Sequence, residues 1–154
     1  RSSDLNQLVT KFFDISLSLI KHNNFLSYAL GALYAKAHQC NDAIILNAQD
    51  RIADTCMANL FMIQANEIIT PPLTEACIAG ILRKEWIQWL RASGYSIAEK
   101  PIPVAALLEA DEVFVTNSIF PMRWVGRIAE KTYSNLQIRE IYRAFRQTKP
   151  DCFC

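Results

Sequence analysis

The stretch from Asp54 to Arg83 holds the residue types and spacings of this 154-residue chain that best suit binding chemistry. Asp54 supplies a carboxylate near the end of a predicted strand, and Gly80 follows a predicted helix start at Thr74. Glycine has no Cβ, so the backbone at Gly80 can approach another group closely. Free N–H groups at a helix N-terminus bind phosphate. Taken alone, Gly80 therefore favours a tight turn or close helix packing, with a phosphate site as the alternative.

Short apolar runs rich in strand-forming residues predict the elements that position this stretch. The expected strands cover residues 43–46, 51–55, 58–63 and 67–69, with a turn between the first two. Pro71 and Pro72 end the last of these strands, because proline cannot join a sheet ladder. A helix is expected from Glu75 to Ala92, closed by Gly94. The side chains expected to face the core from this helix are Ile78, Ile81, Leu82, Trp86 and Trp89.

The rest of the chain alternates between helical and strand-like patterns. Helices are expected at 3–13, 24–38, 103–108 and 135–146, and strands at 13–20, 95–102, 112–116 and 122–128. The helix over 24–38 is expected to turn its apolar stripe inward, namely Leu26, Leu30, Leu33 and Ala37. Several runs of strands broken by helices favour a mixed α/β domain.

Composition places the chain among ordinary globular proteins and argues against several partners. Hydrophobic residues make up 51% and charged residues 20% of the sequence, and the net charge is +1. No basic stripe with interleaved aromatics suggests nucleic acid, and no apolar run is long enough to span a membrane. Five cysteines without zinc-site spacing argue against a metal and favour free thiols in the cytoplasm.

Ten residues in the central stretch match, in order, the motif of one enzyme family. They are Cys56, Asn59, Leu60, Phe61, Ile68, Thr70, Ile78, Gly80, Ile81 and Arg83. The pattern resembles the class IV aminotransferases, which are pyridoxal 5'-phosphate (PLP) enzymes of fold type IV. The resemblance implies the large C-terminal cofactor-binding domain of that fold, in which a barrel-like sheet is flanked by helices. One position departs, because Asp54 stands where the family has Glu.

The resemblance assigns the cofactor chemistry to one lysine and one acid. Lys21, at the end of a predicted strand, corresponds to the lysine that binds the cofactor aldehyde. Asp54 aligns with the acid that pairs with the pyridine nitrogen. Aspartate lacks one methylene of glutamate, which shortens its reach by roughly 1.5 Å. The alternative for Asp54 is a solvated residue at a turn.

Phosphate binding is implied at two places, the amides that follow Gly80 and the hydroxyl of Ser118 at the end of an Asp-Glu-apolar strand. The cofactor-binding residues that the resemblance implies are Lys21, Asp54, Asn59, Gly80, Ile81, Leu82, Asn117 and Ser118. Lys21 is also the catalytic residue, and no metal ligand is expected.

Two short segments are similar to one branch of the family, the aminodeoxychorismate lyases. They are Lys21-His22-Asn23 and residues 116–121. The implied function is a PLP-dependent lyase of folate biosynthesis that converts 4-amino-4-deoxychorismate to 4-aminobenzoate and pyruvate. The alternatives are a branched-chain or D-amino-acid transaminase of the same fold and a non-catalytic module that kept the fold.

The resemblance also implies a domain organisation and partners. Residues 1–20 are expected to form a lead-in segment with a strand, and residues 21–154 the PLP-binding C-terminal domain. The family's N-terminal domain is expected to be absent from this sequence. The expected partners are a small-molecule substrate and a second copy of the chain in a homodimer, without nucleic acid or membrane.

Lys21→Ala is expected to abolish covalent attachment of PLP, because no other residue near the motif supplies the amine. Borohydride reduction followed by peptide mass mapping locates the attachment in the wild type and shows its loss in the variant. Lys36→Ala is the matched control and should keep the adduct. An adduct that maps to Lys36 or Lys84 in the wild type would contradict the assignment.

Overall fold

The computed structural model describes residues 3–10 and 26–149, and of residues 3–10 only the backbone. The strand expected over 13–20 and the lysine predicted to bind the cofactor, Lys21, lie outside the described residues and stay predictions. The helices are α2 (Leu26–Ala37), α3 (Ile81–Ala92), α4 (Val104–Glu109) and α5 (Leu136–Thr148), with a 3-10 turn η1 (Leu73–Glu75).

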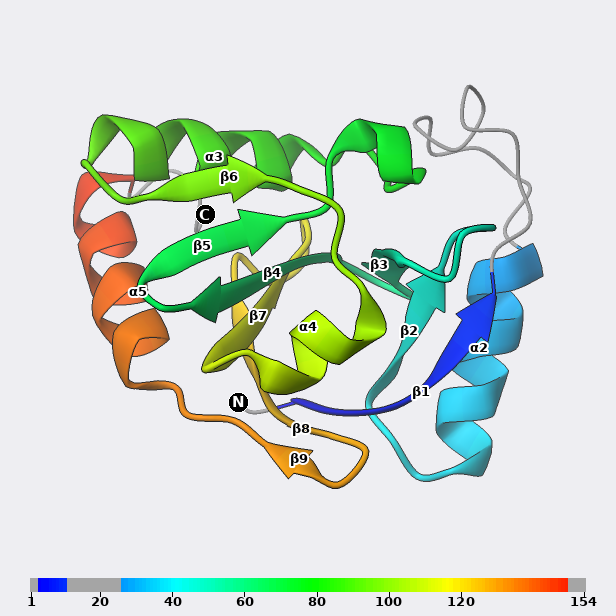
Figure 1. Ribbon diagram of the computed structural model, residues 1–154. Coiled ribbons are helices and arrows are strands. Elements are labelled where there is room, and N and C mark those ends of the chain that lie inside the picture. Colours follow the sequence, from blue (N-terminus) through cyan, green and yellow to red (C-terminus); the bar gives the residue numbers. More distant parts are fainter. Residues whose placement is uncertain (1–2, 11–25, 150–154) are drawn as a thin grey trace.

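One mixed sheet contains all of the described strands (Figure 1). The strands are β1 (Ser3–Thr10), β2 (Asp42–Leu46), β3 (Ile52–Thr55), β4 (Asn59–Gln64), β5 (Glu67–Thr70), β6 (Ile97–Glu99), β7 (Glu112–Thr116), β8 (Arg123–Ile128) and β9 (Lys131–Thr132). Their order is β3-β2-β1-β8-β7-β4-β5-β6, and β9 pairs with β8. The strands expected between residues 43 and 128 are thus confirmed, with small differences at their ends, except that only Ile97–Glu99 of the strand expected over 95–102 is found.

The first element is a strand, so the helix expected over residues 3–13 is wrong. β1 lies in the interior of the sheet, parallel to both β2 and β8. Backbone pairing with two neighbouring strands outweighs the helical spacing of the apolar residues in this segment.

The segment that follows β6 brings the two ends of the sheet together. Ile52 at the start of β3 donates its N–H to the carbonyl of Ile102, with a nitrogen-to-oxygen distance of 2.9 Å. Arg51 forms an isolated antiparallel bridge with Pro103. The sheet is therefore curled, although the described strands do not close into a barrel. The expected mixed α/β fold is confirmed.

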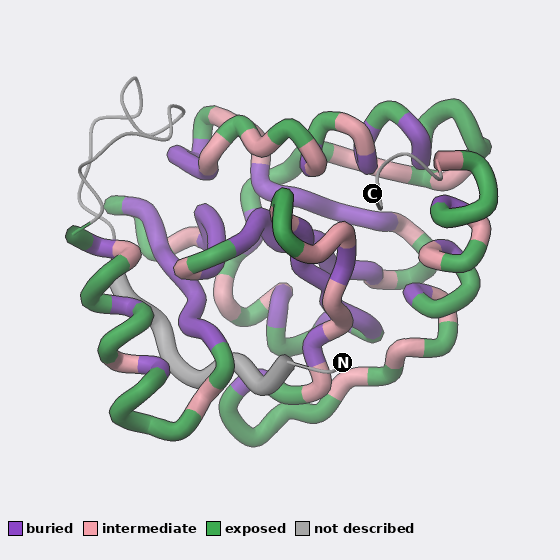
Figure 2. The backbone as a smooth tube through the Cα atoms, turned by 180° about the vertical axis from the view of Figure 1, so that it is seen from behind, coloured by how far each residue is buried: buried purple, intermediate pink, exposed green. Residues whose placement is uncertain are grey.

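Each face of the sheet carries its own hydrophobic core, since side chains alternate along a strand. Leu60 and Val115 belong to the core on the face covered by α4. Phe61 and Phe114 belong to the core under α3 and α5, and their rings stack with centroids 4.8 Å apart. Figure 2 shows the central strands as a continuous buried layer.

The helix expected over Glu75–Ala92 is α3, but it begins only at Ile81. Ala76, directly after η1, has a left-handed backbone with φ 67°, so the chain turns before the helix starts. Ile81 is consequently 84% exposed and does not face the core, whereas Trp86 and Trp89 are buried as expected. The later start places the helix N-terminus directly after Gly80.

The helix expected over 24–38 is confirmed as α2, but its predicted inner face is wrong. Leu26, Leu30 and Leu33 are 64%, 50% and 63% exposed. The buried residues are the small ones, Ser27, Gly31 and Ala35. Small side chains allow the helix to lie close to the sheet, and this geometry outweighs the burial of the larger leucines.

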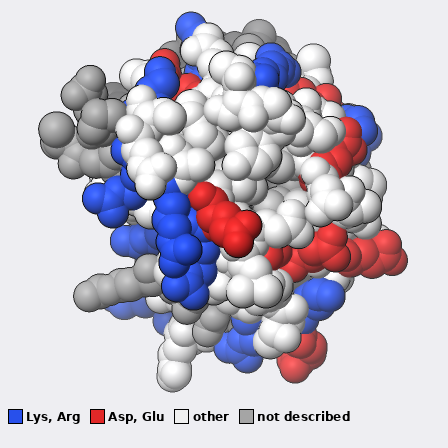
Figure 3. All heavy atoms as spheres, turned by 90° about the vertical axis from the view of Figure 1, so that its left-hand side faces the viewer, with Lys and Arg blue, Asp and Glu red and all other residues white. Residues whose placement is uncertain are grey.

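None of the helices in the described part of the chain is long and apolar enough to cross a bilayer. Figure 3 shows basic and acidic side chains together on the face that lies at the left of Figure 1, with uncharged surface between them. Within residues 26–149, no group of three His, Cys, Asp or Glu side chains could hold a metal ion.

Glu75 ties η1 to the turn between β2 and β3. Its buried carboxylate accepts hydrogen bonds from Arg51 Nη2 at 2.8 Å and from Asn47 Nδ2 at 2.7 Å. The hydrogen bond from Arg51 is the main reason that the pKa of Glu75 lies below its ordinary value of 4.5. A lowered carboxyl pKa stabilises the fold above about pH 4.5, and this stabilisation is lost as the pH falls through the folded-state pKa.

Glu75→Gln is expected to lower the free energy of unfolding at pH 7 by about 1–3 kcal/mol, because a hydrogen-bonded buried charge is lost. The variant should also lose less stability than the wild type between pH 5 and pH 3. Denaturant unfolding at several pH values measures both effects. Glu109→Gln, at an exposed position of α4, is the control and should follow the wild-type pH curve. Parallel pH curves for Glu75→Gln and the wild type would contradict this role.

Candidate active site

The site is centred on the carboxylate of Asp54, which lies in β3 and is only 2% exposed. Asp54 Oδ1 accepts a hydrogen bond from Asn59 Nδ2 at 2.7 Å. Asp54 Oδ2 accepts one from the backbone N–H of Ile78, also at 2.7 Å. This burial rules out the alternative of a solvated turn residue. A buried carboxylate held by several donors has a fixed direction.

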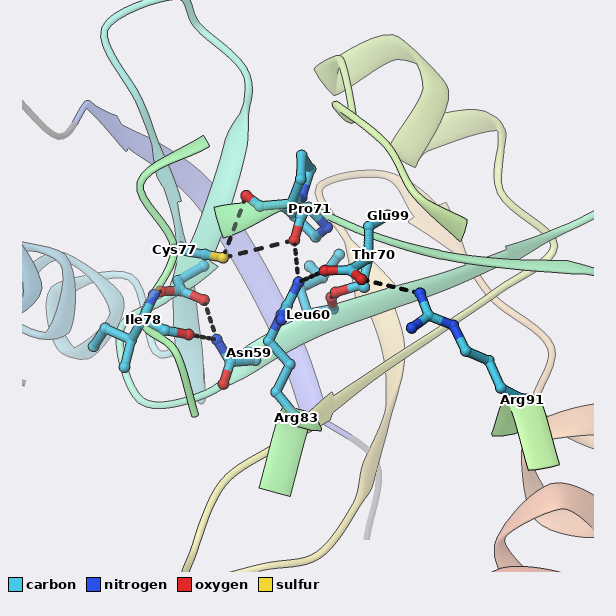
Figure 4. Close-up of polar contacts among 11 residues, drawn as sticks. Asn59, Leu60, Thr70, Pro71, Cys77, Ile78, Arg83, Arg91 and Glu99 are labelled. Carbon is cyan, nitrogen blue, oxygen red and sulfur yellow. Dashed lines mark hydrogen bonds and ion pairs between the residues drawn. The ribbon is translucent and has the colours of Figure 1, made fainter. Parts of the chain in front are cut away.

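Asn59 joins the acid to the loop that precedes α3. Its side-chain amide donates both to Asp54 Oδ1 and to the carbonyl of Ile78, the latter at 2.8 Å (Figure 4). The same side chain meets Gly80, where a Cβ would lie only 2.2 Å from Asn59 Oδ1. Any residue larger than glycine at position 80 would therefore displace the side chain that holds the acid.

The N-terminus of α3 directly follows Gly80. The first helical hydrogen bond at this end runs from the N–H of Lys84 to the carbonyl of Gly80 at 3.1 Å. The N–H groups of Ile81 and Leu82 precede that bond, and Gly80 gives them no side-chain cap. Such amides, together with the positive end of the helix dipole, form an anion-binding site. The structure thus brings Asp54, Asn59 and this helix end into one place.

Two motif residues hold the loop rather than a ligand. Arg83 Nη2, in α3, donates to the carbonyl of Pro71 and to Glu99 Oε2, both at 2.8 Å (Figure 4). Thr70 Oγ1 donates to the carbonyl of Leu60 at 2.7 Å, across β5 and β4. These contacts fix both ends of the segment 71–80, and with it the position of Gly80.

The segment after β7 adds a second polar turn at the same end of the sheet. Asn117 Nδ2 donates to the carbonyl of Met57 at 2.9 Å, and Asn117 Oδ1 accepts the N–H groups of Ile119 and Phe120. The turn leaves Ser118 exposed. The carbonyl of Met57 lies in the connection between β3 and β4, which carry Asp54 and Asn59. The assignment of Asn117 and Ser118 to the cofactor remains a prediction.

Sequence reasoning missed Tyr28, which belongs to the site. Its hydroxyl donates to Asp54 Oδ2 at 3.3 Å from α2. Burial, followed by the charge of Asp54, raises the pKa of the Tyr28 phenol well above its ordinary value. No sequence signal could have marked this residue, because it lies outside the motif and its direction depends on which face of α2 packs on the sheet.

Comparison with known protein families identifies the family of this chain. The model of the amino-transferase class IV family matches residues 13–128, which is most of the chain. The chain belongs to the class IV aminotransferase family. The family predicted from the motif is confirmed.

Two curated relatives of this chain are named for different activities. The chain is 33% identical to the aminodeoxychorismate lyase of Vibrio harveyi over 109 residues, which are 71% of this chain and 40% of that protein. It is 34% identical to the mitochondrial branched-chain-amino-acid aminotransferase 1 of Arabidopsis thaliana over 99 residues, 63% of this chain and 26% of that protein. The chain therefore spans less than half the length of either class IV relative.

Solved structures share the fold. A putative 4-amino-4-deoxychorismate lyase from Legionella pneumophila superposes with a TM-score of 0.88 at 24% identity, over 96% of this chain and 56% of that one. An aminotransferase from Brucella abortus, solved with PLP bound, superposes with a TM-score of 0.84 at 21% identity, over 96% of this chain and 55% of that one. PLP is the cofactor of class IV enzymes.

The residues present fit this cofactor. The end of α3 offers N–H groups to a phosphate, and the missing Cβ of Gly80 keeps that end tight against Asn59. Asp54 is a buried acceptor for a protonated ring nitrogen. Thr116, whose Cα is paired with that of Asn59, has a buried hydroxyl without a hydrogen-bond partner among the described residues. A polar ligand suits such a place, since buried hydroxyls are normally bonded.

Gly80→Ala is expected to weaken PLP binding at least tenfold, because the added Cβ would displace Asn59 and with it the Asp54 carboxylate. Absorbance titration with PLP measures the affinity, and thermal unfolding of the cofactor-free protein measures the stability.

Gly94→Ala is the matched control for Gly80→Ala. Gly94 has φ +80° and no atom within 4 Å of an added Cβ. The substitution should cost about 1–2 kcal/mol of stability through backbone strain and leave the PLP affinity unchanged. Equal PLP affinity in Gly80→Ala and the wild type would remove Gly80 from the site.

Proposed function

We propose that residues 21–154 bind PLP in an enzyme that converts 4-amino-4-deoxychorismate to 4-aminobenzoate and pyruvate. The observation that carries the proposal is the buried carboxylate of Asp54, bonded through Asn59 to the loop in front of α3. This arrangement combines an acceptor for a ring nitrogen with an anion site at one end of the sheet.

The chain's own residues divide the work of holding the cofactor. The N–H groups of Ile81 and Leu82 bind the phosphate, and the Ser118 hydroxyl donates a further hydrogen bond to it. The Asp54 carboxylate accepts the N–H of the pyridine ring and keeps that nitrogen protonated. Lys21 supplies the amine that binds the aldehyde. We place this assembly in a homodimer, the state that the family resemblance implies.

Proton transfer falls to Lys21 Nζ. When bound, PLP supplies an electron sink that stabilises negative charge on the carbon next to the substrate amine. The substrate amine displaces Lys21 from the aldehyde, and the freed Lys21 Nζ then removes the proton from that ring carbon as general base. The bond from the ring to the enolpyruvyl oxygen then breaks, and the ring becomes aromatic. A proton added to the enolpyruvyl methylene gives pyruvate, so the products contain all atoms of the substrate.

The turn after β7 favours the lyase over a transaminase. Residues 116–121 match the lyase pattern, and the Asn117 side chain shapes their turn through its bonds to the N–H groups of Ile119 and Phe120. The 34% identity to the branched-chain-amino-acid aminotransferase supports transamination as the second candidate.

Direct assay separates the candidates. The purified protein is saturated with PLP and incubated with 4-amino-4-deoxychorismate, and separately with branched-chain amino acids plus 2-oxoglutarate. Release of 4-aminobenzoate and pyruvate supports the lyase, whereas glutamate formation supports the transaminase. A protein that shows no PLP absorbance band and neither activity would be a non-catalytic module.

Asp54→Asn is expected to leave the fold intact and to reduce turnover by orders of magnitude, because an amide does not keep the ring nitrogen protonated. The assay is the rate of product release at saturating PLP. Asp50→Asn, at an exposed turn position, is the control and should retain wild-type turnover. Wild-type turnover in Asp54→Asn would exclude Asp54 as the partner of the ring.

Asp54→Glu tests the shorter reach of this acid. Because Asp54 is held by Asn59 and Ile78 on both oxygens, a longer side chain must displace at least one donor. We therefore expect turnover below that of the wild type, together with a lower melting temperature. Turnover equal to or above the wild type would show that aspartate is merely tolerated here.

A further inference from the structure

Three separate elements send a hydrogen-bond donor to the carboxylate of Asp54. Asn59 approaches from β4 and the backbone N–H of Ile78 from the loop before α3, both at 2.7 Å. Tyr28 approaches from α2 and donates its hydroxyl to Oδ2 at 3.3 Å. The first two donors lie close together in the fold, whereas Tyr28 comes from a helix on the other side of β3 in the sequence. Asp54 is thus held from two directions.

The small residues of α2 fix the position of Tyr28. Ser27, Gly31 and Ala35 are buried, so they set the face of the helix that packs inward. Tyr28 is half-buried at the edge of this face, where its ring can extend toward β3. The same packing leaves the leucines of α2 exposed. Helix α2 therefore packs on the sheet through its smallest side chains, and Tyr28 bonds the helix to the Asp54 carboxylate.

The Tyr28 phenol remains neutral beside the Asp54 carboxylate. Burial, and then the charge of Asp54, raises the pKa of Tyr28 far above neutrality. A neutral hydroxyl can only donate to the carboxylate, and it adds no positive charge that would compete with a protonated ring nitrogen. Lysine or arginine in the same position would pair with the acid and weaken its effect on a second cation.

We infer that Tyr28 is a positioning residue, whose hydroxyl orients the Asp54 carboxylate toward the pyridine nitrogen of PLP. The inference rests on the proposed role of Asp54 and extends the site to α2, an element that contributes no motif residue. Tyr28 acts only through Asp54, so the loss of its hydroxyl should not change PLP affinity or kcat in a variant that lacks the Asp54 carboxylate.

Tyr28→Phe removes the hydroxyl and keeps the ring. We expect the dissociation constant of PLP to rise about three- to tenfold, the range for loss of one hydrogen bond. We also expect kcat to fall while KM stays near the wild-type value. The melting temperature of the cofactor-free protein should remain close to that of the wild type.

Tyr34→Phe is the matched control on the same helix. The Tyr34 ring stacks on His38 with centroids 3.8 Å apart, so it carries the same chemical change away from Asp54. PLP affinity, kcat and KM should all remain at wild-type values in this variant. An equal loss in Tyr28→Phe and Tyr34→Phe would reduce the effect to helix packing and overturn the inference.

A double-mutant cycle tests whether Tyr28 acts through Asp54. In the Asp54→Asn background, Tyr28→Phe should produce no further loss of PLP affinity or kcat. Full additivity, or a Tyr28→Phe variant that binds PLP as tightly as the wild type, would overturn the inference while leaving the proposed function intact. Wild-type PLP affinity and turnover in Asp54→Asn would instead overturn the role of Asp54, on which the inference rests.

Discussion

The buried amide of Asn59 is the contact on which the rest of the site depends. One nitrogen atom bonds the acid in β3 and a carbonyl in the loop before α3. The backbone must come close enough for both bonds, and it does so only because residue 80 has no side chain. The position of the acid relative to the helix end is therefore set by a single close approach between a strand and a loop. Loss of the Asn59 amide or of the space at Gly80 would therefore move the Asp54 carboxylate away from the start of α3.

The surrounding structure is built to keep this approach in place. Arg83, just after the loop, donates to the carbonyl of Pro71 at its start, and Thr70, just before the loop, donates to the carbonyl of Leu60 in β4. Trp86, on the buried side of α3, stacks on Phe145 of α5 with centroids 3.9 Å apart and anchors the helix over the sheet. The motif in this chain thus contains residues of two kinds, those that connect Asp54 to the start of α3 and those that hold the surrounding backbone. The spacing of the motif alone does not distinguish them.

Much of the fold could be predicted from local pattern. The apolar runs of β2 to β5 and of β7 are short and bounded by turn residues, so their pattern coincides with the observed strands. β1 could not be predicted in this way, because its apolar residues also fit the spacing of a helix and its pairing with β2 and β8 joins segments far apart in the sequence. The inner face of α2 was missed for a related reason, since close packing of glycine and alanine competes with the burial of leucine. Asp54, Asn59 and Gly80 were found because the motif fixes their order, whereas Tyr28 depends on a tertiary contact that no local pattern records.

Glu99 of β6 bonds to residues at both ends of α3. Its carboxylate accepts one bond from Arg83 near the start of the helix and another from Arg91 near the end, at 2.8 and 3.0 Å. These residues lie about 12 Å apart along the helix axis at 1.5 Å per residue. One carboxylate of β6 therefore ties both ends of α3 to the sheet. The partly exposed bond to Arg91 contributes less to this link than the bond to the buried Arg83.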